Sequence, residues 1–234
     1  MTETLFRDDA YLGRATAKVV RADAGGIVLQ RTIFYPAGGG QPGDRGTLTW
    51  GGETIEIVDT LKDKETGDII HVPASGAALP ENDREVRLDL DWPRRYAHMR
   101  MHTCLHLLCA VVDGAVTGGQ ISTEKGRLDF NLAQSPDKEA LNVALNRLIA
   151  DNLPVTSRWI EDAELAANPD MVRTLSVKPP MGTGRVRVID IAGADSQPCG
   201  GTHVRATGEI GPVRIGKIEN KGKQNRRINI LFEG

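Results

Sequence analysis

Short segments in which apolar and polar residues alternate fill the first 90 residues of the chain. Residues 15–23 (ATAKVVRAD) and 27–35 (IVLQRTIFY) flank Gly25 and Gly26, and such a pattern predicts a β-hairpin. Further alternating runs predict strands at residues 47–50, 54–61, 68–72 and 84–90. We therefore expect a small all-β domain with a barrel-like arrangement over residues 1–90.

The stretch PAGGGQPGDRG, residues 36–46, interrupts this alternation. Its glycines and prolines are incompatible with a helix or a regular strand. We expect a loop that either brings backbone close to a binding site or serves as a tight connection between strands.

The pattern changes after Trp92 and Pro93. Residues 94–113 contain no Gly or Pro, and Leu105, Leu108 and Val112 follow helical spacing. Residues 114–119 are expected to end this helix in a loop. A second helix is expected to begin at Ser135, with Ser135 as its N-cap, Pro136 in its first turn and leucines at 141, 145 and 148.

Strands are predicted at residues 126–133, 155–160, 185–192, 211–220 and 226–233. Residues 91–234 are thus expected to form an α+β domain after the barrel-like domain of residues 1–90.

Composition narrows the class of protein. The chain has 234 residues with 40% hydrophobic and 26% charged residues, as in ordinary globular proteins. The net charge of -2 excludes a strongly basic nucleic-acid-binding domain, so any such contact must come from local patches. Three cysteines suggest no disulfide framework. We see no signal peptide and no apolar run long enough to span a membrane, so the expected location is the cytoplasm.

Two histidines and a Cys–His pair have the spacing of metal ligands. His102 and His106 are four residues apart on the predicted helix and therefore share one face. Cys199 and His203 lie in the segment CGGTH, where the glycines are expected to let the chain turn tightly. Zinc is commonly held by four such imidazole and thiolate ligands. The segment 195–198 is expected to be a loop that carries this turn.

The remaining histidines and cysteines receive no metal role. Cys104 and Cys109 are expected to pack as small apolar residues on the helix. His98 is interpreted as a surface histidine in preference to a pocket residue, and His71 is given no role.

Four motifs in order give the chain a resemblance to a known family. They are TIFYPAGGGQPGDRG at 32–46, MHTCLHLL at 101–108, GRLDF at 126–130 and CGGTHVRATGEIGPVRIGKIENKGKQNRRI at 199–228. With these motifs the chain resembles the AlaX-type alanyl-tRNA editing proteins, free-standing relatives of the alanyl-tRNA synthetase editing domain. Its length and its glycine-rich motif resemble the medium-length subtype.

The resemblance implies an editing domain of the threonyl/alanyl-tRNA synthetase type with Zn²⁺ on His102, His106, Cys199 and His203. It implies hydrolysis of the ester in alanine tRNA mischarged with serine, and in some members glycine. It also implies no need for ATP, and it does not fix an oligomeric state. Whether zinc polarises the carbonyl, activates water or anchors the substrate stays open.

Several residues are candidates for the substrate pocket. By the resemblance, Thr32 is the candidate contact for the serine side chain, although β propensity alone also explains a strand threonine there. Gln41 is expected to brace the glycine-rich loop or to line the pocket. Thr103 offers a hydroxyl beside the metal ligands, and Gln120 could orient a water or a substrate amide.

Two groups of basic residues are candidates for contacts with tRNA phosphates. They are Arg94 and Arg95 near the first helix, and Lys217, Lys221, Lys223, Arg226 and Arg227 near the C-terminus. For any single one of them a solvated charged turn is an equally good interpretation, but the group as a whole favours contact with tRNA.

Two other functions compete with editing. A non-catalytic RNA-binding module with a structural zinc would use the same ligands. A zinc hydrolase of small esters would too, but the H-E-x-x-H signature is absent, because residues 103–105 are Thr-Cys-Leu.

Overall fold

The computed structural model describes residues 2–174 and 184–233. The chain divides into two compact units, Met1–Tyr96 and Ala97–Gly234. The domain assignment made from the sequence, 1–90 and 91–234, stays a prediction, because compactness alone does not show independent folding. No helix among the described residues is long and apolar enough to cross a membrane.

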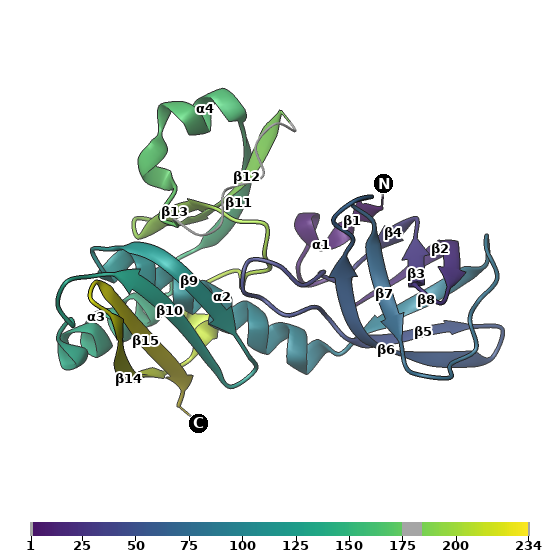
Figure 1. Ribbon diagram of the computed structural model, residues 1–234, viewed down its shortest axis with the longest axis horizontal. Coiled ribbons are helices and arrows are strands. Elements are labelled where there is room, and N and C mark those ends of the chain that lie inside the picture. Colours follow the sequence, from purple (N-terminus) through teal and green to yellow (C-terminus); the bar gives the residue numbers. More distant parts are fainter. Residues whose placement is uncertain (1, 175–183, 234) are drawn as a thin grey trace. The chain divides into compact units, whose positions relative to one another are not determined.

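The first unit is built on a closed β-barrel (Figure 1). In pairing order its strands are β2 (Arg14–Asp23), β3 (Gly26–Leu29), β7 (Ile69–Pro73), β6 (Glu53–Lys62), β5 (Gly46–Trp50) and β8 (Glu85–Leu90). β1 (Glu3–Thr4) and α1 (Leu5–Asp8) precede the barrel, and β4 (Arg31–Thr32) pairs with β1 in parallel. The predicted barrel is confirmed, and so is the hairpin of β2 and β3, where Ala22 pairs with Ile27.

Alternation along the strands fills the barrel. Every second residue of β2 and β8 faces inward, so that Val19, Val86 and Leu88 are fully buried together with Leu48 of β5. Most intervening positions, such as Lys18, Glu85 and Arg87, are polar and exposed, as expected for an antiparallel sheet with one solvated face. Burial of these aliphatic side chains is the main source of stability for a core with few aromatic residues.

A buried ion pair fastens the glycine-rich loop to the start of helix α2 (Trp92–Val111). Arg95 is fully buried and donates from Nε to both carboxylate oxygens of Asp44, at 3.1 and 2.9 Å. It also donates to the carbonyl oxygens of Ala10 and Ile33. The Asp44 carboxylate in turn accepts from the backbone N–H of Tyr35. The predicted contact of Arg95 with tRNA is therefore wrong, because its guanidinium has no exposed surface.

Close approach explains one glycine of this loop. A Cβ added to Gly43 would lie 2.2 Å from the carbonyl oxygen of Thr60, a distance that no side chain tolerates. The loop therefore runs directly against strand β6.

The described residues of the second unit form two sheets. The larger sheet has the order β14 (Val213–Gly222), β15 (Asn225–Phe232), β10 (Lys125–Asn131) and β9 (Ala115–Ile121). The smaller sheet has the order β11 (Val155–Glu161), β12 (Arg185–Ile191) and β13 (Asp195–Pro198). The helices of this unit are α3 (Lys138–Ala150), α4 (Asp162–Ala167), η1 (Pro169–Met171) and η2 (Thr207–Ile210), in addition to most of α2. The predicted α+β class is confirmed.

Helix α2 lies against the larger sheet. A Cβ on Gly126 of β10 would lie 2.7 Å from the sulfur of Met101, so glycine permits this close contact. Helix α3 covers β14, where Asn146 and Asn142 bond to the backbone of Val213 and Ile215. Helix α2 lies between the larger sheet and the segment after β13 that carries Cys199 and His203.

Buried side chains of α2 agree only in part with the predictions. Cys104 and Cys109 are buried as expected. His98 is also fully buried, so its interpretation as a surface histidine is wrong. The helix begins at Trp92, two residues before the predicted start, because proline is tolerated in a first helical turn.

Three local predictions in this unit are wrong. Residues 114–119 do not form a loop, because β9 pairs with β10 through its backbone despite two glycines, with a register shift beside Phe130. Residues 195–198 form strand β13, paired with β12. The N-cap of α3 is Asp137, whose carboxylate accepts from the N–H of Ala140 at 2.8 Å, and Ser135 lies before the helix.

We expect Arg95→Leu to lower the free energy of unfolding by about 3–5 kcal/mol, because it leaves the Asp44 carboxylate buried without its cation. The matched control is Arg94→Leu, which changes a half-buried neighbour and should cost about 1 kcal/mol or less. Chemical denaturation of both variants measures the difference. Equal losses in the two variants would show that the ion pair does not stabilise the loop.

Candidate metal centre

Four side chains from two distant segments converge in the second unit. His102 and His106 lie on α2, and Cys199 and His203 lie in the segment after β13. One ligand atom from each residue lies within 4.8 Å of all the others. The Cys199 sulfur is 3.6 Å from Nε2 of His102, which is 97 residues away, and 3.3 Å from Nε2 of His203.

Helical geometry places the two α2 histidines as the spacing requires. The ring centroids of His102 and His106 are 5.4 Å apart, and the ring of His203 lies 4.4 and 4.7 Å from them. All three imidazoles are buried. The four candidate ligands thus face one another inside the protein instead of pointing to solvent.

A carboxylate that sequence reasoning missed orients His106. Asp195, the first residue of β13, has a buried side chain whose Oδ2 accepts from Nδ1 of His106 at 3.0 Å. Gln197 donates to the same oxygen at 2.8 Å. With Nδ1 protonated, Nε2 of His106 keeps its lone pair for a metal, as in many carboxylate–histidine–metal arrangements.

Thr103 does the same for His203. Its hydroxyl oxygen lies 3.2 Å from Nδ1 of His203, 3.0 Å from the carbonyl oxygen of Met99 and 3.2 Å from the N–H of Val204. All contacts are satisfied when Thr103 donates to Met99 and accepts from both other groups. Nε2 of His203 then carries the lone pair that faces Cys199.

Arg187 of β12 holds the segment that carries Cys199. Its guanidinium donates to the carbonyl oxygens of Cys199 and Gly201, each at 3.0 Å. The expectation that glycines are needed for a tight turn is not met, because neither Gly200 nor Gly201 has a positive φ and a Cβ on Gly200 would meet open space. Side-chain bonds from the neighbouring strand therefore hold this segment.

The cluster has strong internal electrostatics. Burial lowers the pKa of His106, but hydrogen bonds to Asp195 and Cys199 outweigh it and raise that pKa to about 10. Burial opposes the Cys199 thiolate, yet the nearby His102 and His203 hold its pKa well below the usual range. Burial and the charge of His102 lower the pKa of His203. The site therefore favours a thiolate at Cys199 and a neutral imidazole at His203, the forms that ligate metals, whereas His106 has to release a proton when it binds one.

Distances within the cluster suit a metal ion. Metal–ligand bonds of about 2.0–2.3 Å at tetrahedral angles place neighbouring ligand atoms roughly 3.3–3.8 Å apart. The 3.3 and 3.6 Å separations around Cys199 fall in this range. Burial raises the pKa of Cys104 and of Cys109 to about 12, so neither thiol offers a competing thiolate.

Comparisons with known proteins identify the family of the chain. The family model described as threonyl and alanyl tRNA synthetase second additional domain matches residues 186–229, and the model for tRNA synthetases class II (A) matches residues 7–94. The alanyl-tRNA editing protein AlaX-M of Methanosarcina acetivorans is 40% identical over 97% of this chain and 98% of its own. The AlaX-M protein of Pyrococcus horikoshii is 33% identical over 100% and 99%, respectively.

The chain belongs to the AlaX-M family of alanyl-tRNA editing proteins. The family predicted from the motifs is thereby confirmed, and the predicted enzyme class, an aminoacyl-tRNA deacylase, agrees with it. The chain also matches the alanine–tRNA ligase of Pyrobaculum neutrophilum at 34% identity, over 93% of this chain and 25% of the ligase. The AlaX-M chain thus corresponds to a part of that larger enzyme.

The predicted pocket residues of this AlaX-M family member lie in different places. Thr32 and Gln41 belong to the first unit and are buried, at 0% and 2% exposure, so a substrate group reaches them only if neighbouring chain moves aside. Gln120 is exposed on β9 and accepts from Arg127 at 3.3 Å. Its predicted position on a loop is wrong, since it belongs to a paired strand.

His71, which was given no role from the sequence, is the partner of Thr32. Its Nε2 lies 2.7 Å from the Thr32 hydroxyl, and its Nδ1 lies 2.9 Å from the carbonyl oxygen of Ile27. Burial lowers its pKa to about 4. No sequence signal marks this pair, because 39 residues separate the two side chains.

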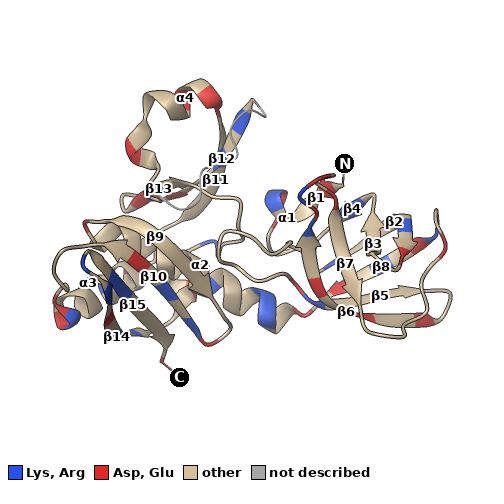
Figure 2. Ribbon diagram, in the orientation of Figure 1, with Lys and Arg blue, Asp and Glu red and all other residues tan. Residues whose placement is uncertain are grey.

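The predicted tRNA contacts differ in exposure. Lys217, Lys221 and Lys223 are exposed on β14 and at its turn to β15, and Glu219 is the one acidic residue on these two strands, where Figure 2 shows Lys and Arg in blue. Arg226 is buried and donates to backbone carbonyl oxygens of Gly222, Asn225 and Ala133, so its predicted phosphate contact is wrong. Arg227 binds Asp129 through two hydrogen bonds and lowers the pKa of that carboxylate.

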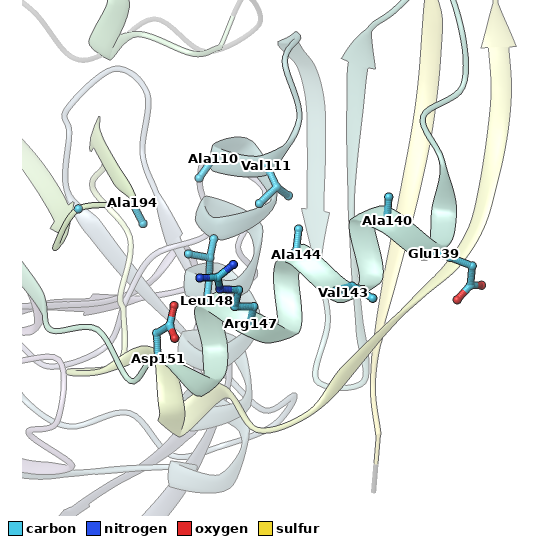
Figure 3. Close-up of a pocket in the computed structure, with 11 residues that line it drawn as sticks. Ala110, Val111, Glu139, Ala140, Val143, Ala144, Arg147, Leu148, Asp151 and Ala194 are labelled. Atoms are coloured by element: carbon cyan, nitrogen blue, oxygen red, sulfur yellow. The ribbon is translucent and has the colours of Figure 1, made fainter.

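A groove of about 830 Å³ lies elsewhere on the second unit, between the end of α2, helix α3 and the β12–β13 turn (Figure 3). Alanine and valine side chains line much of it, including Val143, which is 70% exposed. None of the four candidate ligands lines this groove, so it is separate from the metal centre.

Acid should destabilise the protein through His71. In the unfolded chain this imidazole takes up a proton below pH 6.5, whereas the folded chain keeps it neutral down to about pH 4. Its contribution is therefore present above pH 6.5 and falls by about 3 kcal/mol as the pH drops to 4. Free energies of unfolding measured across this range should show a steeper acid loss than in His71→Phe. Parallel curves for the two proteins would contradict this account.

Proposed function

We propose that this chain is a trans-editing deacylase that hydrolyses the ester of alanine tRNA mischarged with serine, and also with glycine, at a zinc site. The observation that carries the proposal is the convergence of His102, His106, Cys199 and His203 on one buried point. The names of relatives that match nearly the full chain support alanyl-tRNA editing. The amino acid is what the family resemblance implies, and the metal is inferred from the chemistry of the donor set.

Zinc is the metal that this donor set favours. Three imidazoles and one thiolate are typical zinc ligands, whereas magnesium and calcium prefer oxygen. When bound, zinc supplies Lewis acidity at the reacting ester or an anchor for a polar group of the substrate. The chain itself supplies the oriented lone pairs, through Asp195 behind His106 and Thr103 behind His203.

Hydrolysis adds water across the ester. The bond between the aminoacyl carbonyl carbon and the ribose oxygen breaks, and the products are a free amino acid and a free tRNA hydroxyl.

An alanine pocket rejects serine poorly, because a pocket cannot strongly exclude a ligand that adds one hydroxyl. A second site that holds the serine hydroxyl by a hydrogen bond removes this error, and we assign that contact to Thr32. We propose that Gln41, which is buried in the glycine-rich loop of residues 36–46, braces that loop.

Phosphate contacts of the tRNA are assigned to Lys217, Lys221 and Lys223. They are exposed, and the only carboxylate within 4 Å of Lys217 and Lys221 among the described residues is Glu219, at 3.7 and 3.6 Å. Arg227 and Arg94 are weaker candidates, because the first is paired with Asp129 and the second is half-buried. Such contacts bind any phosphate backbone and weaken as salt rises.

The decisive assay compares single substitutions of two cysteines. Cys199→Ala should lower kcat/KM for serine-charged alanine tRNA by at least about 100-fold, because removal of a member of a reactive site typically costs several kcal/mol. His106→Ala should act similarly. The matched control is Cys104→Ala, which removes a buried thiol from the same unit but not from the cluster and should keep its activity.

Other outcomes of this assay separate the competing functions. Tight tRNA binding without turnover by the unmodified protein would favour a non-catalytic RNA-binding module. Turnover of small esters but not of charged tRNA would favour a different zinc hydrolase. Loss of the folded state in Cys199→Ala, judged by circular dichroism, would point to a structural metal.

Asp195→Asn should weaken zinc binding by roughly 10- to 100-fold, because partners behind a ligand orient it and raise its basicity. Competition with a chromogenic chelator measures the affinity without any activity assay. Asp190→Asn is the matched control, since this carboxylate on β12 contacts Ser196 and Arg158 and no candidate ligand. If both variants bind zinc equally, Asp195 has no role in orienting His106.

A further inference from the structure

The groove beside α3 has an apolar middle and a charged side chain near each end of the helix. Ala140, Val143 and Ala144 line the groove from α3. Figure 3 shows Val143 between Glu139 and Arg147. At 70% exposure, Val143 is the most exposed large apolar side chain among the described residues. An apolar surface of this kind is typical of a site that another molecule covers.

The two charged residues have no ion-pair partner within the described part of the chain. Glu139 and Arg147 are both exposed, and among the described residues no oppositely charged side chain lies within 4.0 Å of either. They are too far apart to pair with each other, because their separation along the helix is roughly 12 Å. Both charges are therefore available to a second molecule.

The spacing of these residues is symmetric about Val143. Glu139 precedes Val143 by one helical turn, and Arg147 follows it by one turn. An antiparallel copy of the helix, related by a two-fold axis at Val143, places each Glu139 opposite Arg147 of the other copy. The same axis brings the two Val143 side chains together. A two-fold interface must be complementary to itself, and this pattern meets that requirement.

The groove gives a second helix room beside α3. Its opposite wall is formed by the end of α2 and by the turn between β12 and β13. The residues of this wall are uncharged and mostly small: Ala110, Val111, Gly193 and Ala194. Nucleic acid is a poorer fit, because the described lining carries two carboxylates, Glu139 and Asp151, against the one guanidinium of Arg147.

We propose that two copies of this chain associate through α3, with Val143 at the two-fold axis and an ion pair between Glu139 and Arg147 on each side of it. Each α3 then lies in the groove of the other copy. The apolar centre supplies most of the affinity, and the charged pairs fix the register. A contact of one helix with one groove is small, so we expect a dissociation constant on the order of 10 µM.

Sedimentation velocity of the full chain over about 1–300 µM measures this association. The unmodified protein should pass from monomer to dimer as its concentration rises. Val143→Asp should raise the dissociation constant at least about 30-fold, because the central side chain is lost from both copies. The matched control is Val20→Asp, which changes an exposed valine on β2 and should leave the dissociation constant unchanged.

Charge reversal tests the register of the two helices. Glu139→Arg and Arg147→Glu each place like charges opposite each other on both sides of the axis, so each variant alone should associate roughly tenfold more weakly. An equimolar mixture of the two variants should recover the lost affinity, because every charge then faces an opposite charge. Asp151→Arg is the matched control, since in this arrangement it lies beyond the start of the opposing helix and should have little effect.

Three results would overturn the inference. A monomer at every concentration would do so, and if the charge variants then alter tRNA binding, the groove belongs to nucleic acid. A dimer that Val143→Asp does not weaken uses a different surface. A mixture of the charge variants that associates no better than either alone shows that the register is wrong. The substituted side chains are exposed, and far-ultraviolet circular dichroism checks that each variant is folded.

Discussion

The structure of the second unit depends on packing three imidazoles and one thiol into a buried space less than 5 Å across. Such groups are poorly tolerated in a protein interior without partners, because each would lose its hydrogen bonds to water. Here the outward-facing Nδ1 atoms of His106 and His203 are satisfied by Asp195 and Thr103, and Arg187 holds the backbone carbonyl of Cys199. The inward-facing imidazole nitrogens and the thiol sulfur face one another, and a bound cation stabilises this arrangement.

This constraint explains features of the fold that are otherwise unrelated. Two ligands come from one helical face, so α2 must continue through the cluster, and Gly126 lets that helix lie directly on the sheet. The other two ligands follow β13, whose pairing with β12 places Asp195 behind His106 and Arg187 behind Cys199. Specific pairing of a short strand thus sets the position of the ligands more firmly than the glycines between them.

Local sequence patterns predicted the elements that depend on local interactions. Alternation found the barrel strands, and the four-residue spacing of His102 and His106 placed them on one helical face. Predictions from local patterns were wrong where a partner distant in the sequence determines the secondary structure. Residues 115–121 and 195–198 contain glycine, proline or polar residues typical of loops, yet each forms a strand because a neighbouring strand offers its backbone. The N-cap of α3 is Asp137 and not the predicted Ser135, because the Asp137 carboxylate accepts from the N–H of Ala140.

The same reason limits what the sequence revealed about function. The ligand residue types and their spacing, together with the family motifs, indicated the candidate metal centre. The groups that orient it did not, because Asp195, Arg187 and His71 look like ordinary strand residues until tertiary contacts show their partners. For Arg95 and Arg226 a contact with tRNA was predicted, but both side chains are buried, because a basic residue in a sequence does not reveal whether its charge is buried.

The central claim is that one zinc ion occupies this cluster with both segments of the chain as ligands. X-ray absorption spectroscopy at the zinc edge on the purified, zinc-loaded protein tests it most directly. The account predicts a coordination shell of three nitrogen neighbours at about 2.0 Å and one sulfur neighbour at about 2.3 Å. A shell of nitrogen and oxygen without sulfur, or the absence of bound zinc, would contradict it.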